Sequence, residues 1–338
     1  MTSAHPSSHF YRKAYMTTHA EYERFVEHWG GRVRFYDLVA QSLKTQLGEL
    51  ISIWQVNGYS PLYMFYTKDC FPSVETISNQ TKNVAAIIAF TPYKRSPNNL
   101  VDSPYITNEH QQKIPIGLVP YYNKETLAKF ISTTCLVHRR KKSKINVTLL
   151  SQRLPRYLTV AQKVHTQLSL NKNIKSINWV GDVIYREDVL YGINTGSALS
   201  IYFGHGRAKG WVGYNGVQIQ ELKLYQDKPN AAILSLCCET ASRRRVQFSF
   251  CEQLILNGIS AVSMGAINKT LFTNNTRWAI SISNELQNEL DTIGDLIVKA
   301  KPSNEDAWKH YRLFGDPTIK MYPDENFYKE IKKIKTYE

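Results

Sequence analysis

The chain has 338 residues, 43% of them hydrophobic, and carries 42 lysines and arginines against 28 aspartates and glutamates, a formal net charge of +14. This hydrophobic content excludes an extended disordered protein, and no apolar run reaches the roughly 18 residues that a membrane-spanning helix needs. The length allows one large domain or two subdomains.

The first 140 residues are expected to form an N-terminal α/β subdomain. Helices are predicted at 20–29 and 37–50, and strands at 51–56, 62–66 and 84–90. Residues 91–113 are rich in proline, asparagine and serine and predict a long loop. A helix follows from Asn123, its predicted cap, to about Leu136.

Residues 141–325 alternate strands and helices, and 326–338 form a basic C-terminal tail. Strands are predicted at 147–150, 176–180, 198–203, 231–236 and 259–264, and helices at 157–168, 186–193, 218–224, 247–257, 275–290 and 293–301. This alternation predicts a mostly parallel sheet covered by helices on both faces.

Two of the predicted strands end in residues that carry chemistry. The run 198–203 ends in Gly204-His205-Gly206, and the run 231–236 ends in Cys237-Cys238. The stretch between the runs is long enough for the crossover helix that parallel strands need. If the two strands are neighbours, their carboxyl ends meet at one sheet edge, where an imidazole would serve a thiol nucleophile.

This pairing of a Gly-His-Gly strand with a later cysteine strand resembles the gingipain family of cysteine peptidases, within the wider caspase-like group. Ile114–Pro120 resembles the segment that ends the family's first subdomain, and Leu313–Thr318 resembles its closing Gly-Asp-Pro turn. The similarity extends over residues 114–322 and is strongest over 197–267. It implies a three-layer α/β/α caspase-like fold with a mostly parallel sheet, preceded by a smaller α/β subdomain.

The resemblance also implies the roles of the site residues. His205 and Cys238 would form the catalytic dyad, and the backbone amides of Gly206 and Cys238 would bind the oxyanion. Cys237 is the alternative nucleophile, but it continues the apolar run, whereas Cys238 begins the polar turn. A helix expected to begin within 241–246 would stabilise the Cys238 thiolate through its dipole.

Four further residues are candidates for supporting roles. Asp182 follows a predicted strand and could orient the imidazole, or it is a simple turn residue. Glu239 could line the substrate pocket or cap the following helix. Trp211 could form an apolar wall of the cleft or pack in the core. Arg243 could favour an acidic substrate residue or face solvent.

Cysteine and histidine spacing bears on the compartment and on metal binding. Five cysteines show no disulfide or zinc pattern, which is typical of a reducing compartment. The first nine residues are not followed by an apolar signal segment. We therefore expect a cytoplasmic protein, or a secreted effector without a recognisable signal peptide, and neither a catalytic metal nor a cofactor.

Taken together, these patterns predict a cysteine endopeptidase of restricted specificity that acts on protein or peptide substrates through a covalent thioester intermediate. Basic clusters at 138–144 and 329–335 could bind an anionic partner, a nucleic acid, an anionic lipid or an acidic protein, or they are simply a solvated linker and a solvated tail. The alternative function is a catalytically inactive caspase-like scaffold that binds a protein or nucleic-acid partner through this basic surface.

Overall fold

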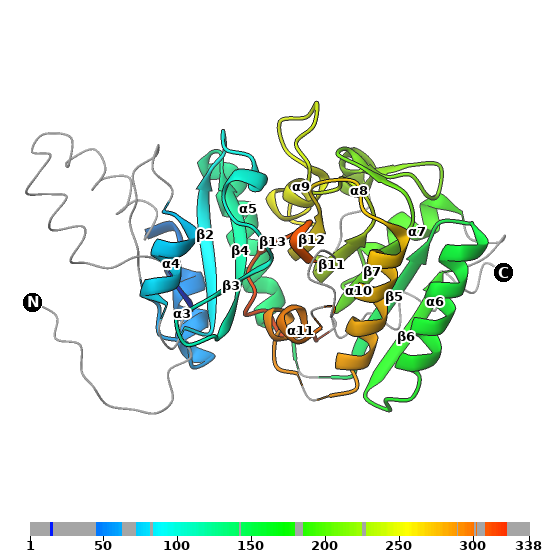
Figure 1. Ribbon diagram of the computed structural model, residues 1–338, viewed down its shortest axis with the longest axis horizontal. Helices are drawn as coiled ribbons and strands as arrows, with labels where there is room; N and C mark the ends of the chain where they lie inside the picture. Colours follow the sequence, from blue (N-terminus) through cyan, green and yellow to red (C-terminus); the bar gives the residue numbers. More distant parts are fainter. Residues whose placement is uncertain are drawn as a thin grey trace, which may run out of the picture.

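The computed structural model describes residues 14–15, 45–62, 72–81, 84–141, 143–179, 185–224, 228–288, 290–300, 302 and 308–322. Its centre is one continuous sheet with helices packed on both faces (Figure 1). The fold is therefore the three-layer α/β/α arrangement that the sequence predicts.

Across the described part of the chain, the sheet has ten strands. Nine lie side by side, each hydrogen-bonded to the next, and the tenth, β3 (Tyr105–Thr107), pairs with β4 outside this row. In spatial order the nine are β1 (Ala14–Tyr15), β2 (Ala86–Pro92), β4 (Lys113–Tyr121), β13 (Tyr311–Gly315), β12 (Ser260–Ala266), β11 (Asn230–Leu236), β7 (Leu199–Phe203), β5 (Ile145–Ser151) and β6 (Ile174–Trp179). Neighbours among the nine run parallel, except that β12 and β13 are antiparallel. The sheet thus joins both predicted subdomains, and their division at residue 140 stays a prediction.

The central strands form because their sequences are apolar on both faces, as parallel strands between two helical layers require. Every residue of β11 is buried. Its side chains alternate between the faces: Leu234 and Leu236 pack in one core, and Ile233 packs in the other. At β11 the sheet therefore separates two of the three hydrophobic clusters formed by the described residues.

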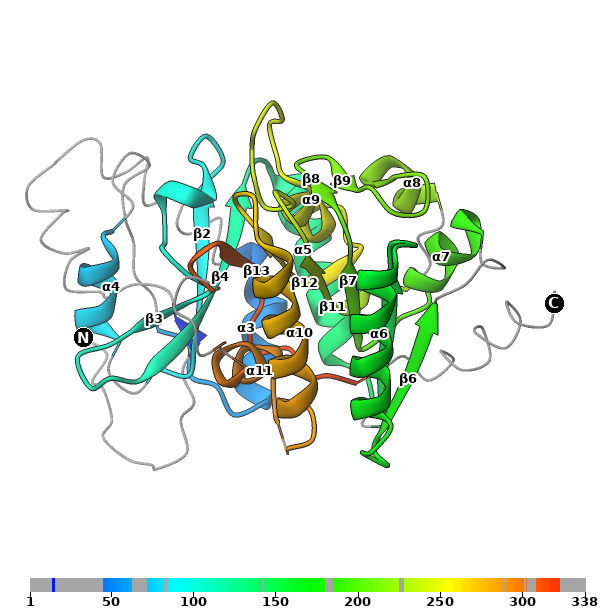
Figure 2. The same cartoon turned by 45° about the vertical axis from the view of Figure 1, so that its right-hand side comes forward.

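The helices divide into two layers. One layer contains α6 (Pro155–Leu168), α10 (Phe272–Glu285) and α11 (Ile293–Lys299), and α6 lies beside α10 (Figure 2). The opposite layer contains α3 (Gly48–Val56), α5 (Lys124–His138), α7 (Arg186–Ile193), α8 (Ile219–Leu224) and α9 (Phe250–Leu256). The short helices α4 (Val74–Gln80) and η2 (Pro97–Asn99) flank the first strands.

Most predicted elements from residue 84 onward are confirmed, with ends that differ by a few residues. Helix α5 begins after Asn123, whose side chain accepts a hydrogen bond from the Thr126 amide as a capping residue does. The predicted helix at 20–29 and most of the strand at 62–66 lie outside the described residues. No helix in the described part is long and apolar enough to span a membrane.

Two expectations for the elements are wrong, and one strand of the central sheet has no counterpart among the predictions. Residues 51–56 are helical rather than extended, because Leu47, Leu50 and Trp54 recur at helical spacing and are all buried. The expected loop at 91–113 contains η2 and β3. Strand β13 was not predicted, although it lies between β4 and β12 and joins the two halves of the sheet.

A buried polar network fixes α3 and α5 to the Gly-Asp-Pro turn after β13. The Asp316 carboxylate accepts a hydrogen bond from Trp54 Nε1 (2.7 Å) and lies 2.9 Å from His138 Nε2. Its other oxygen accepts bonds from the Thr318 amide (2.8 Å) and hydroxyl (2.7 Å). The Asp316 side chain is 0% exposed and that of His138 is 1% exposed. The network therefore holds α3, α5 and the turn after β13 together in one buried contact, although they are far apart in the sequence.

The basic cluster expected at 138–144 is partly used in packing. His138 belongs to the buried network, and the Arg140 guanidinium donates hydrogen bonds to the carbonyls of Pro229 and Gly196 (3.4 Å to Gly196). Arg139 pairs with Glu49 at 2.6 Å. This stretch is thus not simply a solvated charged face. The second cluster, at 329–335, lies outside the described residues.

Candidate active site

Strand pairing brings the histidine and cysteine segments to the same sheet edge. Strands β7 and β11 are parallel neighbours, and Phe203 pairs with Leu236 at their carboxyl ends. His205 and Cys238 each follow two residues later. A Cβ atom on Gly206 would lie only 2.5 Å from the Cys238 carbonyl oxygen. The two strand ends are therefore in direct contact, and only glycine fits between them.

The Cys238 thiol is half-buried and is covered by the loop that follows β12. Its Sγ accepts a hydrogen bond from the Thr270 amide (3.3 Å) and lies 3.6 Å from the Thr270 hydroxyl. The same loop holds the backbone after the thiol, because the Glu239 amide donates to the Asn268 carbonyl (3.1 Å). A backbone N–H donor stabilises a thiolate more than a thiol.

The expected contribution from a helix dipole at this cysteine is wrong. Residues 241–249 form turns and bends, and α9 begins only at Phe250 with Ser249 as its cap. No helix N-terminus follows Cys238 directly, so the amide of Thr270 takes the place of the dipole as the donor near the sulfur.

The neighbouring Cys237 lies in a different environment. It is 0% exposed, and its Sγ lies 3.9 Å from the Thr240 hydroxyl. Burial raises the pKa of the Cys237 thiol well above its usual value. Cys237 is therefore suited to packing, and Cys238 is the more accessible of the two thiols.

His205 is exposed, and its backbone is anchored on both sides. Its amide donates to Gln152 Oε1 (2.8 Å), and its carbonyl accepts bonds from the Val212 amide (2.9 Å) and the Tyr202 hydroxyl (3.1 Å). The bond from Val212 makes Gly206 and Trp211 the non-hydrogen-bonded pair between β8 (Gly206–Arg207) and β9 (Gly210–Trp211). The Gly206 amide consequently points away from β9.

The imidazole contacts residues at the start of α6. Arg156 Nη2 lies 2.9 Å from His205 Nε2, and the Tyr157 ring meets the imidazole edge to face at 5.6 Å. A guanidinium has only donors, so this contact assigns the acceptor role to Nε2 and the ring proton to Nδ1. Burial raises the pKa of Tyr157, Arg156 opposes this rise, and the charge of Cys238 adds to it. Tyr157 thus lies near both proposed catalytic groups.

Two of the supporting residues have structural roles instead. Trp211 is 2% exposed, stacks on Tyr202 with ring centroids 4.6 Å apart, and donates to the Ser235 hydroxyl. It packs in the core, which is one of the two roles that the sequence left open, and it does not form a wall of the cleft. Trp211 also pairs with Val217 of the short strand β10 (Val217–Gln218).

Arg243 forms an ion pair with the buried Glu252 at 2.5 Å, its guanidinium lies over the Phe248 ring, and it donates to the Tyr93 carbonyl. Arg243 therefore has neither of the two roles that the sequence left open. Its side chain is 11% exposed and does not simply face solvent, and Glu252 neutralises the charge that an acidic substrate residue would need.

The remaining candidates for supporting roles are Glu239 and Asp182. Glu239 does not cap a helix, since Ser249 caps α9, and its carboxylate lies 3.3 Å from the Arg244 guanidinium. Its φ of 58° is unusual for a residue with a side chain and lies next to the proposed nucleophile. A role for Glu239 in the substrate pocket stays a prediction. Asp182 lies outside the described residues.

Sequence reasoning missed the residues that β5 and β12 contribute to this edge. Gln152 and Arg156 follow β5, and Thr270 follows β12. The spatial order β12, β11, β7, β5 brings four loops together, which chain order does not reveal. Polar residues just beyond each strand end were the available signal.

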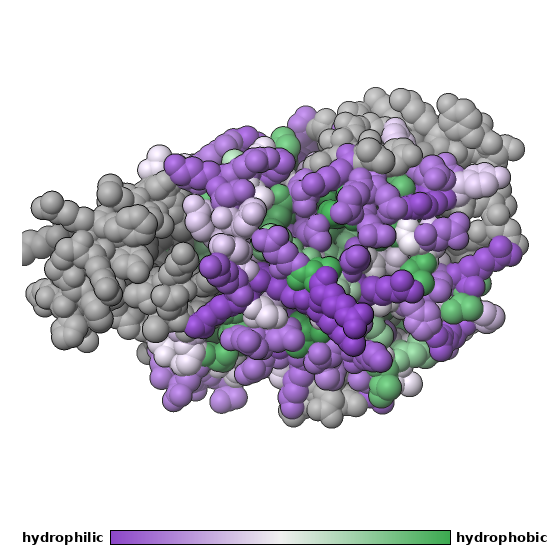
Figure 3. All heavy atoms as spheres, turned by 90° about the horizontal axis from the view of Figure 1, so that it is seen from above, coloured by the Kyte–Doolittle hydropathy of each residue, from purple (hydrophilic) through white to green (hydrophobic). Residues whose placement is uncertain are grey.

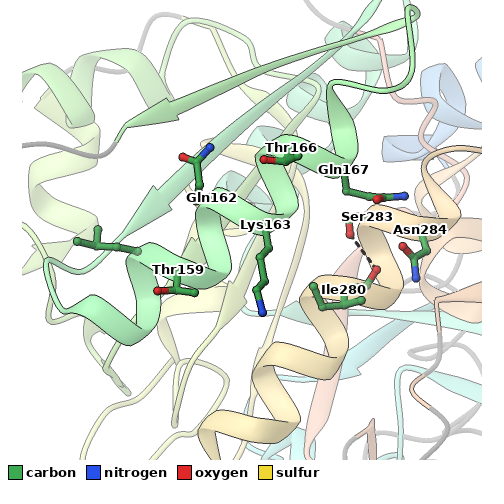
Figure 4. Close-up of a pocket in the computed structure, with 9 residues that line it drawn as sticks. Thr159, Gln162, Lys163, Thr166, Gln167, Ile280, Ser283 and Asn284 are labelled. Carbon is green, nitrogen blue, oxygen red and sulfur yellow. Dashed lines mark hydrogen bonds between the residues drawn. The ribbon is translucent and has the colours of Figure 1, made fainter.

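A groove of about 650 Å³ lies between α6 and α10 (Figure 4). Lys163 on α6 and Ile280 on α10 are among the residues that line it, and Ser283 on its wall donates to the Ile280 carbonyl (2.9 Å). None of the proposed catalytic residues lines this groove. Among the described residues, no group of three histidines, cysteines or carboxylates could hold a metal ion.

Comparison with known proteins identifies the family. A family model described as peptidase family C25 matches residues 79–322. The chain belongs to peptidase family C25, the gingipain family. This C25 protein is a cysteine-type peptidase with a caspase-like α/β/α fold. No curated protein matches it.

Solved structures support the fold of this C25 peptidase at low sequence identity. The Arg-specific cysteine proteinase gingipain R is 14% identical, with a TM-score of 0.62, over 95% of this chain and 80% of that chain. A structure described as a protease is 13% identical, with a TM-score of 0.63 over 94% and 80%. The complex of pro- and mature domains of RgpB from Porphyromonas gingivalis is 14% identical, with a TM-score of 0.61 over 92% and 79%.

Proposed function

We propose that this C25 peptidase is a cysteine endopeptidase of restricted specificity, with Cys238 as its nucleophile and His205 as its proton shuttle. The contact between Gly206 and the Cys238 backbone carries this proposal, because it joins the two strand ends from which the imidazole and the thiol project. The half-buried Cys238 thiol and its Thr270 donor favour it over the sealed Cys237.

The reaction follows from these groups. His205 takes the proton of the Cys238 thiol, and the resulting thiolate attacks the scissile carbonyl carbon. The amides of Gly206 and Cys238 donate to the oxygen that becomes negative. The tetrahedral intermediate collapses as the imidazolium of His205 protonates the leaving amine, which leaves a thioester on Cys238. Neutral His205 then takes a proton from the water that attacks the thioester. The C–S bond breaks, the Cys238 sulfur takes that proton back from His205, and the acid product is released.

Site labelling combined with turnover tests the proposal. We expect a peptidyl acyloxymethyl ketone to modify the parent protein once, at Cys238, as located by peptide mass spectrometry. Cys238→Ala should abolish this labelling and peptide cleavage, whereas His205→Ala should lower cleavage by a factor of about 10² to 10⁴. Labelling of Cys238→Ala as fast as the parent would contradict the assignment of the nucleophile.

Restricted specificity is supported by the groups that crowd the imidazole. Tyr157 packs against both His205 and Phe272 (ring centroids 5.6 and 5.5 Å apart), and Arg156 lies beside them. A cleavage map of a denatured protein mixture tests this: we expect one or two residue types before the scissile bonds. Cytoplasmic residence, or export without a recognisable signal, stays a prediction.

A further inference from the structure

An arginine without a carboxylate partner lies at the proposed dyad. Arg156 is exposed at the start of α6, and among the described residues its polar contacts are to His205 Nε2 (2.9 Å) and the Tyr157 hydroxyl (3.1 Å). Its guanidinium lies over the rings of Tyr157 (4.7 Å) and Phe272 (5.7 Å). All of these partners are uncharged groups, so nothing in the described part of the chain neutralises this cation.

The geometry of Arg156 leaves it able to bind an anion. Both polar contacts use Nη2, which leaves the Nη1 and Nε donors for a ligand. The aromatic rings contact the face of the guanidinium, so the Nε–H and Nη1–H groups on its edge can donate a charge-assisted hydrogen bond to a carboxylate. Because Nη2 reaches His205 Nε2, a carboxylate bound to the same guanidinium would lie close to the reacting groups.

The surrounding strand ends are also positively charged. The four segments that form the edge, 151–157, 204–212, 237–249 and 266–272, contain one acidic residue, Glu239. Their basic residues are Arg153, Arg156, Arg207, Lys209, Arg243, Arg244, Arg245 and Lys269. Glu239 is paired with Arg244. Seen from above in Figure 3, hydrophilic side chains predominate among the residues drawn in colour.

We infer that Arg156 determines specificity by binding the carboxylate of an aspartate or glutamate side chain of the substrate, next to the scissile bond. The inference rests on the proposed function, since it names the substrate class of the same site. A basic substrate residue would need a free carboxylate, and the one carboxylate in these segments is held by Arg244. An acidic residue instead supplies the partner that Arg156 lacks.

Matched activated peptides test the inference on the parent protein. Four acyloxymethyl ketones would carry aspartate, asparagine, alanine or arginine before the warhead, and the rate of Cys238 modification would be measured for each. We expect aspartate to react about ten- to a hundredfold faster than asparagine, as one charge-assisted pair allows. Equal rates for aspartate and asparagine, or a preference for arginine, would overturn the inference and leave the proposed function intact.

Variants separate recognition from a merely structural role of Arg156. Arg156→Gln should remove the preference for aspartate over asparagine, and Arg156→Lys should keep part of it. Arg277→Gln, which removes an exposed arginine from α10, is the matched control and should retain the full preference. If Arg156→Gln slows the aspartate and asparagine probes equally, Arg156 acts only on the position of His205, and the inference is wrong.

Binding to inactive protein keeps the two proposals distinguishable. If no activated peptide modifies Cys238, the proposed function fails, and recognition is then measured on Cys238→Ala protein with acetylated peptide amides that end in aspartate or asparagine. Tighter binding of the aspartate peptide, lost in the double variant with Arg156→Gln, would support the inference without turnover. Equal binding of the two peptides would overturn it.

Discussion

Two adjacent cysteines show how strongly a one-residue shift changes the chemistry of a side chain. Successive residues of an extended chain point to opposite faces, so Cys237 continues into the core and Cys238 leaves it. The same local geometry that hides one thiol therefore presents the other to the Thr270 amide and to solvent.

We predict that Cys237→Ala keeps the reactive site and weakens the fold. Removal of a fully buried sulfur should lower the free energy of unfolding by about 1 to 2 kcal/mol, because its packing contacts are lost. Labelling of Cys238 by an activated peptide should persist. Urea unfolding and labelling rates on the same preparation check both parts, and a folded Cys237→Ala protein that fails to label would contradict the assignment.

The close approach at Gly206 gives a second prediction. A methyl group there would meet the Cys238 carbonyl and Cys237 Sγ at 2.5 Å, so one strand end must shift. We expect Gly206→Ala to reduce peptide cleavage by at least about a hundredfold, since a shift of about 1 Å in reacting groups has this effect. Gly48→Ala is the control, because its Cβ meets nothing within 4 Å and should leave cleavage unchanged.

At the scale of elements, the sequence predicts those strands and helices whose formation depends on patterns among neighbouring residues. The apolar runs that end at His205 and Cys238 and the alternation of strand and helix are local, and the structure has them in the expected places. The prediction fails at residues 51–56 because Ile51 and Ile53 alternate as in a strand, while Trp54 continues a helical spacing. Arg156 and Thr270 could not be assigned, since their proximity to the dyad depends on strand order.

The contact between α3, α5 and the Gly-Asp-Pro turn after β13 depends on Asp316. The pKa of Asp316 predicts how the stability that this contact contributes changes with pH. Burial alone would raise the pKa of this carboxyl, but the hydrogen bond and charge of His138, with bonds from Thr318 and Trp54, lower it below its usual value. A lowered pKa means that the stabilisation is present at neutral pH and is lost as the pH falls through the folded pKa.

We therefore expect Asp316→Asn to lower the free energy of unfolding by about 3 kcal/mol at pH 7, as the loss of a buried charged partner does. The difference from the parent should shrink below about pH 4, where carboxyls begin to protonate. Urea unfolding of both proteins across this range checks it. Glu125→Gln, which breaks the exposed pair with Lys129, should change stability by under about 1 kcal/mol at every pH. A pH-independent effect of Asp316→Asn would refute the linkage.

At the scale of the whole molecule, one sheet connects both halves of the chain. Strand β4 pairs with β13, and β13 pairs with β12, so neither half completes the sheet alone. We expect a single cooperative unfolding transition, with β4 and β12 equally protected in native-state hydrogen exchange. Separate transitions for the two strands would instead support independent subdomains divided at residue 140.

The net charge of +14 acts beyond the site, because a surface of one sign attracts substrates of the other. If Arg156 recognises an acidic residue, kcat/KM for an aspartate peptide should fall about tenfold between roughly 50 and 500 mM salt, since the Debye length shortens and screens the attraction. A peptide with asparagine at that position should change less than about twofold. Equal salt dependence for both peptides would mean that the positive surface does not select substrates. Retention of the protein on DNA that is steeply salt-dependent and blocks cleavage would instead assign the basic surface to a nucleic-acid partner.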